Sequence, residues 1–121
     1  LETEWERDGK KSWDNNYKDG KREGLLTQWS IDGKKFREIK YKDGKQEGLE
    51  TLFRSNGQKK QEVNFINGKR EGLETWWHEV GSKYIEVSYI NGKKEGLETR
   101  WHHMNGEKIS EVNYVNGRKK A

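Results

Sequence analysis

The chain has 121 residues, of which 38% are charged and only 28% hydrophobic, and 25 Lys and Arg against 21 Asp and Glu leave a formal charge of +4. This length fits a single domain, and so few apolar residues exclude a large buried core. No segment approaches the run of about 18 apolar residues that a membrane-spanning helix needs. The absence of cysteine excludes disulfides, thiol catalysis and cysteine metal sites.

The glycines reveal an internal repeat of about 24 residues. Ten of the 14 glycines follow Asp, Asn or, at Gly81, Val, and successive members are alternately 11 and 13 residues apart, with one step of 14. The other four are spaced by 24: Gly24, Gly48, Gly72 and Gly96. We therefore expect one repeat array over residues 1–121. Its repeats are predicted at 17–40, 41–64, 65–88 and 89–113, with partial repeats at 1–16 and 114–121.

The segments between the glycines alternate with a period of two, which is typical of strands. The clearest predicted strands, in chain order, are 49–53, 62–65, 73–77, 86–89, 97–101 and 111–114. Asp-Gly and Asn-Gly between such segments indicate tight hairpins with type I′ turns. The sequence thus predicts about ten strands of about six residues. The fold class is all-β: an elongated, twisted, single-layer antiparallel meander of stacked hairpins.

Two series of aromatic residues recur with the repeat, and we expect both to line one apolar face of the sheet. The first ladder is Trp5, Trp29, Phe53, Trp77 and Trp101. The second ladder is Tyr17, Tyr41, Phe65, Tyr89 and Tyr114. Because they recur in every repeat, the rings are first of all the core of the array, and a ligand platform is the alternative. One sheet covers such a face only partly, so we expect further cover from the curl of the sheet itself, from a segment outside this sequence, from a second copy or from a partner protein.

Three apolar residues interrupt positions that are polar in other repeats. Leu52 and Trp76 occupy the position of Glu4, Gln28 and Arg100, and Leu26 replaces a glutamate. We expect Leu26, Leu52 and Trp76 to form an exposed apolar strip on the polar face, as a candidate partner-binding site. Contact with a neighbouring protein, or simple tolerance of apolar residues at these positions, is the simpler interpretation.

The histidines and acids do not form a recognisable catalytic or metal-binding motif. His78 and His102 are equivalent positions about 9.6 Å apart, and His102 and His103 would point to opposite faces of an extended strand. The carboxylates of Glu38, Glu62, Glu86 and Glu111 recur as a solvated row rather than as the isolated pair that glycoside hydrolysis needs. We expect no enzyme, no metal and no cofactor.

Basic residues gather at one set of turns and would line one rim of the ribbon. They are Lys21, Arg22, Lys45, Lys69, Arg70, Lys93, Lys94, Arg118, Lys119 and Lys120. Phosphate or anionic lipid could bind there. Glu23, Glu47, Glu71 and Glu95 lie in the same turns and dilute the positive field, so solubility and protection against edge pairing explain the rim more simply.

The segment Tyr89–Trp101, with the pattern Tyr-x-Asn-Gly-Lys-x-Glu-Gly-Leu-Glu-Thr-x-Trp, resembles the MORN-variant repeat of bacterial antitoxin-like arrays. The resemblance covers essentially the whole chain and implies stacked hairpins with a binding role. We therefore expect a non-enzymatic, protein-binding scaffold that neutralises or docks a partner. The alternatives are a module that binds cell-surface glycan or wall polymer, and association with anionic lipid through the basic rim; nucleic acid is not the expected partner.

Overall fold

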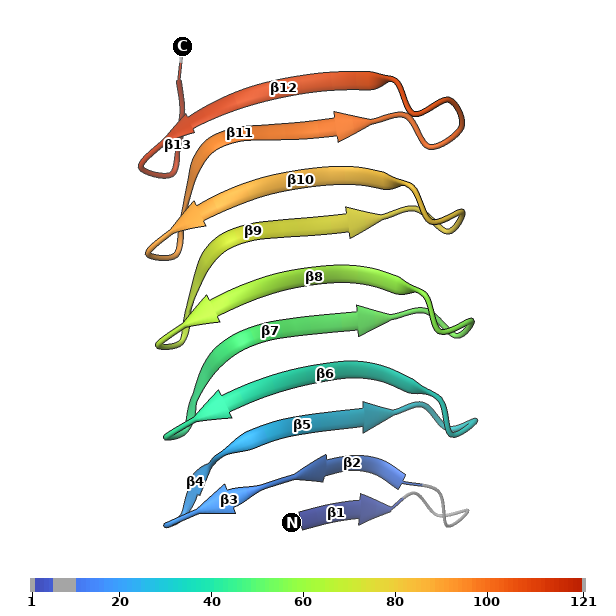
Figure 1. The fold of residues 1–121 in the computed structure, drawn as a ribbon, viewed down its shortest axis with the longest axis vertical. Coiled ribbons are helices and arrows are strands. Elements are labelled where there is room, and N and C mark those ends of the chain that lie inside the picture. Colours follow the sequence, from blue (N-terminus) through green and yellow to red (C-terminus); the bar gives the residue numbers. More distant parts are fainter. Residues whose placement is uncertain (1, 6–10, 121) are drawn as a thin grey trace.

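The chain forms a long antiparallel sheet in a computed structural model that describes residues 2–5 and 11–120, without the side chains of 2–5, 11–13 and 15 (Figure 1). One sheet has eleven strands in the order β1-β2-β5-β6-β7-β8-β9-β10-β11-β12-β13, and β3 pairs with β4 beside it. The strands are β1 (Glu2–Trp5), β2 (Lys11–Asn15), β3 (Tyr17–Lys18), β4 (Lys21–Arg22), β5 (Gly24–Trp29), β6 (Lys35–Lys42), β7 (Lys45–Phe53), β8 (Lys59–Ile66), β9 (Lys69–Trp77), β10 (Lys83–Ile90), β11 (Lys93–Trp101), β12 (Lys108–Val115) and β13 (Arg118–Lys119).

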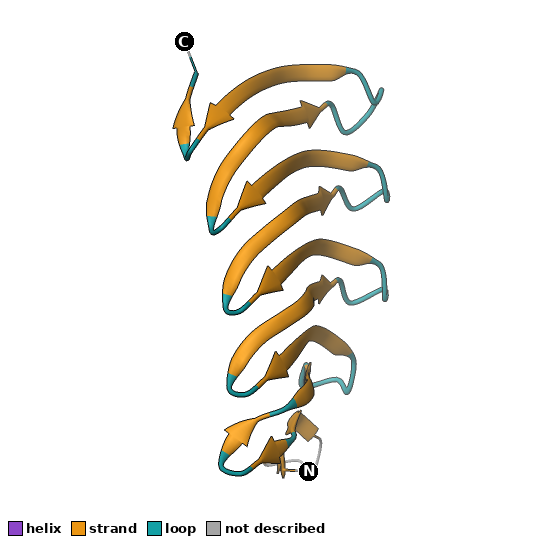
Figure 2. Ribbon diagram, turned by 60° about the vertical axis from the view of Figure 1, so that its left-hand side comes forward, coloured by secondary structure: helices purple, strands orange, loops and turns teal. Residues whose placement is uncertain are grey.

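The predicted all-β meander of stacked hairpins is confirmed, but its central strands are longer than predicted. Strands β6 to β12 have eight or nine residues. In β7, β9 and β11 the reason is the Glu-Gly pair, which lies inside the strand instead of ending it. Gly48 has a φ of 104°, and the pairing of β6 with β7 shifts register between Ile39 and Tyr41 at this place. The chain therefore bends without breaking the strand, and Figure 2 shows each hairpin as an arc.

The two edges of the sheet use different turns. At one edge both central residues have positive φ, as in Asn67 (53°) and Gly68 (82°), which confirms the type I′ prediction there. At the other edge only the glycine does. In the loop after β5, the Gly33 amide donates to the Ser30 carbonyl and the Ser30 amide to the Lys34 carbonyl, which is a three-residue loop. The type I′ prediction is wrong at this edge, and Val80 is tolerated because its φ is not positive there.

The type I′ edge also joins consecutive repeats. The turn glycine amide donates to a carbonyl of the preceding repeat, for example from Gly92 to Arg70 over 2.9 Å. The residue before that glycine donates to a glutamate carboxylate of the preceding repeat, for example from Asn91 to Glu71 over 2.5 Å. The same bond recurs three times, from Asp43 to Glu23, Asn67 to Glu47 and Asn116 to Glu95. The glutamates of the Glu-Gly pairs thus act as clamps between repeats.

Register assigns the side chains to two faces, because residues directly opposite each other on neighbouring strands point to the same side. Glu74 lies opposite Val63 and Val87, whereas Thr75 lies opposite Glu62 and Glu86. The side that carries the valines is here called the valine face, and the side that carries the Leu-Thr-aromatic residues the leucine face. Within the described residues, no helix is long and apolar enough to span a membrane.

Candidate interaction surfaces

The two predicted aromatic ladders lie on opposite faces of the sheet, so the expectation of one shared apolar face is wrong. Tyr89 follows Val87 on the valine face, and Trp77 follows Thr75 on the leucine face. The other members of each ladder follow by the same register, except for Tyr17, whose strand β3 pairs only with β4, and for Trp5, whose side chain lies outside the described residues. The sheet therefore has two partly apolar faces.

The valine face contains the core of the array. Ile39, Val63 and Val87 are only 2–3% exposed although the sheet is a single layer. Neighbours on the same face must provide this cover, and several are aromatic. Cations of the preceding repeat lie over these rings, with Arg22 at 5.2 Å from the centroid of Tyr41, Arg70 at 5.3 Å from Tyr89 and Lys94 at 4.7 Å from Tyr114. These members of the basic rim therefore serve to join repeats.

Three equivalent glutamates lie between the valines, each with hydrogen-bond donors around it. Glu98 binds Lys94 at 2.6 Å and Arg100 at 3.5 Å, and Glu50 binds Arg37 at 3.2 Å. Burial raises the pKa of Glu98, but the hydrogen bond and charge of Lys94, with those of Arg100, more than offset this and leave the pKa below its ordinary value.

Glu74 differs from these two glutamates in its partners. It is 4% exposed and accepts from Gln61 Nε2 at 2.5 Å and Trp76 Nε1 at 3.0 Å, which are neutral donors. Burial, followed by the charge of Glu74, raises the pKa of Tyr89. The row of glutamates is therefore an internal polar network, with its oxygens occupied by the sheet's own side chains.

The predicted strip of Leu26, Leu52 and Trp76 lies on the valine face. Leu26 is opposite Ile39, and Leu52 and Trp76 are both opposite Gln61. Leu26 is 6% exposed, so it belongs to the core and not to an exposed surface; Leu52 and Trp76 are half-buried. The alternation of side chains along each strand correctly predicted that these three residues share one face. The pairing between strands shows that the valines lie on this same face.

The leucine face carries an exposed apolar row that the sequence analysis did not single out. Its members recur with the repeat and are here called the leucine ridge: Leu25, Leu49, Leu73, Leu97, Ile66, Ile90 and Val115. The four leucines are 40–52% exposed. Ile66 is on this face because Asn64, two residues earlier, lies opposite Leu49. The signal in the sequence was an apolar residue directly before each Asn-Gly turn of the type I′ edge.

Charged residues border the leucine ridge on both sides. Lys45, Lys69 and Lys93 are exposed beside the type I′ turns, and each lies against the turn glycine of the next repeat, as Lys21 does. Towards the other edge, the predicted row of solvated carboxylates forms ion pairs with the lysine three residues earlier. These pairs are Lys35–Glu38 at 3.3 Å, Lys59–Glu62 at 2.8 Å, Lys83–Glu86 at 2.8 Å and Lys108–Glu111.

The histidines lie closer together than the sequence analysis expected. His103 stacks on His102 with ring centroids 4.9 Å apart and lies 5.2 Å from His78. His102 and His103 do not point to opposite faces, because they lie in the loop after β11 and not in a strand, as the equivalent Arg54 and His78 lie in the loops after β7 and β9. Among the residues that the structure describes, no three His, Asp or Glu side chains gather as a metal site would require.

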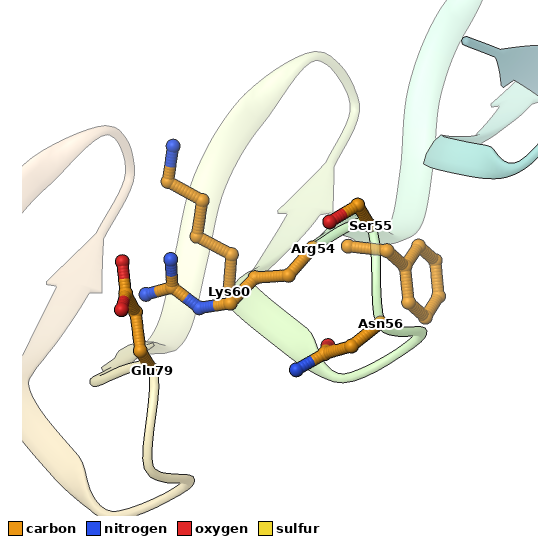
Figure 3. Close-up of a pocket in the computed structure, with 6 residues that line it drawn as sticks. Arg54, Ser55, Asn56, Lys60 and Glu79 are labelled. Carbon is orange, nitrogen blue, oxygen red and sulfur yellow. The ribbon is translucent and has the colours of Figure 1, made fainter. Parts of the chain in front are cut away.

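Two adjoining hollows open at this variable edge, which is the edge with the three-residue loops. One, of about 490 Å³, lies between the loops after β7 and β9 and includes Arg54, Lys60 and Glu79 (Figure 3). The other, of about 400 Å³, is lined by Arg54 and Glu79 together with His78, Tyr84 and His103. Arg54 is held in place because its Nη2 donates to the Trp77 carbonyl of the next repeat over 2.8 Å. The sequence alone does not reveal this site, because the site combines loops of three hairpins.

No family model matches the chain, and no curated protein matches it. Two solved structures are similar in fold. One is the Staphylococcus aureus TarM G117R mutant, described as in complex with Fondaparinux, alpha-GlcNAc-glycerol and UDP, with a TM-score of 0.52, 13% identity and 89% of this chain covered. The other is TarM, with a TM-score of 0.51, 14% identity and 90% covered. This chain spans 21% of either, and a likeness at this level of identity shows the fold alone.

Proposed function

We propose that the chain is a non-enzymatic, protein-binding repeat scaffold whose partner lies along the leucine ridge. The observation that carries this proposal is the exposure of the four equivalent leucines, at 40–52%, in one row with Ile66, Ile90 and Val115. A repeated row of large apolar side chains at the surface is typical of an interaction site. The row extends across many strands, so it offers an elongated surface of the kind that repeat proteins use.

The charged groups support a binding role over a catalytic one. The recurring carboxylates Glu38, Glu62, Glu86 and Glu111 are engaged in ion pairs, and the turn glutamates cap amides of the next repeat. Each group thus has a structural task that repeats with the fold. From the MORN-variant resemblance we further propose that binding neutralises the partner, as in antitoxin-like arrays.

The test is affinity capture from the source cell with three forms of the chain. The double variant Leu49→Lys and Leu73→Lys places charge on the ridge, and the control Val80→Lys and Ile109→Lys replaces two residues that are 74% and 63% exposed at the variable edge. We expect one protein to be retained by the wild type and by the control but lost by the ridge variant. Retention by all three forms, or by none, would contradict the proposal.

An anionic membrane surface is a second candidate, favoured by the lysines that border the ridge. Lys45, Lys69 and Lys93 are exposed on the same side as Ile66 and Ile90. Apolar side chains beside lysines suit the headgroup region of a bilayer, where each cation near an anionic surface contributes about 1 kcal/mol. This candidate predicts that the chain floats with phosphatidylserine vesicles, and that this binding weakens as salt is raised from 50 to 500 mM. Equally strong binding to neutral vesicles would exclude it.

A further inference from the structure

We propose that the hollows at the variable edge bind an acidic saccharide, meaning a sugar unit that carries a carboxylate, sulfate or phosphate group. This inference is independent of the leucine ridge. It concerns the site around Arg54, Lys60, Glu79, Tyr84 and the histidines, here called the edge site.

The first step is that the edge site consists of residues that the repeat does not require. The position of Arg54 is Ser30, His78 and His102 in other repeats, and that of Tyr84 is Phe36, Lys60 and Ile109. The sheet pairs in the same register whichever of these residues is present. Arg54 and His78 each reach a backbone carbonyl of the next repeat, but different side chains occupy their position in different repeats, and such variable loop residues that gather at one place suit a ligand site.

The second step is a row of rings, of which Tyr84, His78 and His103 line one side of the site while Trp76 supports Tyr84 from behind. Tyr84 lies 4.3 Å from His78 by ring centroids, and Trp76 meets Tyr84 edge-on at 6.4 Å. His103 continues the row at 5.2 Å from His78. The rings of Trp76, His78 and Tyr84 are half-buried and His103 is exposed, so part of the row is open to solvent. Such a surface suits the C–H face of a pyranose ring, since binding sites combine apolar rings with a few placed polar groups.

The third step is the charge pattern around these rings. Arg54 is held by its bond to the Trp77 carbonyl, while its Nε is buried without a hydrogen-bond partner in the described part of the chain. Lys60 is exposed beside it, and Figure 3 shows the Arg54 guanidinium extending towards the side chain of Glu79. A guanidinium and an ammonium bind an acidic group strongly. A carboxylate accepts hydrogen bonds from hydroxyls, so Glu79 suits the sugar and not its acidic group.

Because Glu79 repels an anion but accepts hydrogen bonds from a sugar, the direction in which Glu79→Gln changes the affinity distinguishes the two kinds of ligand. If the edge site binds a sugar, Glu79→Gln removes the better acceptor for its hydroxyls and weakens binding. If the site binds only an inorganic anion, the same change removes a repulsion and strengthens binding. Glu79→Gln preserves the shape of the side chain, so the comparison does not depend on repacking.

The experiment is an NMR titration of the whole chain with digalacturonate, a sulfated heparin disaccharide, a neutral digalactoside, inorganic sulfate and a thymidine oligonucleotide. We expect an acidic disaccharide to shift amides of residues 54–56, 78–84 and 103, and the neutral one to bind at least fivefold more weakly. Arg54→Gln should weaken binding about tenfold, as the loss of one charge-assisted hydrogen bond predicts. Glu79→Gln should also weaken it. Lys60 is exposed, so Lys60→Gln should not disturb folding. A loss of affinity in this variant as well would show that the effect of Arg54→Gln is not a folding defect.

Phe36→Ala and Ile109→Ala serve as matched controls, because they change the Tyr84 position in other repeats. They should leave the affinity unchanged, whereas Tyr84→Ala should lower it at least fivefold. The proposal is overturned if neither acidic disaccharide binds at 5 mM, if sulfate binds as tightly as they do, or if Glu79→Gln strengthens binding. Preference for the oligonucleotide over both disaccharides would assign the site to nucleic acid and would also overturn it.

Discussion

The assignment of the two faces predicts an unusual order of mutational effects. Val87→Ala removes two carbon atoms from a side chain that is 3% exposed on the valine face. At about 0.8 kcal/mol for each buried carbon, the loss is about 1.6 kcal/mol, and the cavity raises the total to about 2–3 kcal/mol. Leu73→Ala removes three carbons, but Leu73 is 48% exposed on the leucine face. It should cost only about 1 kcal/mol.

The comparison is well matched because the two residues lie on the adjacent strands β9 and β10. Urea unfolding, followed by circular dichroism, measures the difference in the free energy of unfolding. Because repeat arrays unfold in segments, hydrogen exchange of the β9 and β10 amides is needed as well, to measure the change in stability of these two strands. A larger loss for Leu73→Ala than for Val87→Ala would refute the assignment of faces. A loss for Leu73→Ala that grows with protein concentration would show that another copy covers the ridge.

Three further predictions concern the clamps, the buried network and the turns. Glu71→Gln should destabilise the chain by about 1 kcal/mol or more, because the Asn91 amide loses a charged acceptor, whereas Glu107→Gln at an exposed loop should have little effect by urea unfolding. The pKa of Glu98 is lower in the folded chain than its ordinary 4.5, so the ionised Glu98 stabilises the fold fully above about pH 4.5 and loses this effect as the pH falls through the folded value. The melting temperature should therefore fall less steeply below pH 4.5 in Glu98→Gln than in the wild type. Asn91→Val should cost about 1–3 kcal/mol because a β-branched residue is strained at a φ of 53°, whereas Val80→Asn should be neutral in thermal melts.

The hairpin array could be predicted from the sequence because glycine spacing determines where the chain reverses. Alternation within each strand was also reliable, since Leu73, Thr75 and Trp77 share one side as expected. What alternation cannot give is how the side of one strand relates to that of the next. That relation depends on the loop length and on bulges, and a shift of one residue exchanges the faces. Here the three-residue loops set Thr75 opposite Glu86 and not opposite Val87.

The edge site was beyond prediction for a related reason. Arg54, His78 and His103 are far apart in the sequence, and only the stacking of three hairpins brings their loops together. His102 and His103 lie in the loop after β11, beyond the predicted strand 97–101, so the alternation of side chains along a strand does not tell where they point. Their proximity to His78 is a property of the stacked array, so no single repeat contains the signal.

The unequal turns of the sheet have a consequence for how such an array can change. At the clamped edge, each turn is bonded to its predecessor, so a longer loop would break contacts between repeats. At the opposite edge, the loop after β11 is one residue longer, yet Leu97 still faces Asn113 just as Leu49 faces Asn64. Insertions are absorbed there without disturbing the strands. This edge is therefore the place where new loops could be grafted onto the ribbon, one per hairpin, while the opposite edge maintains the pitch.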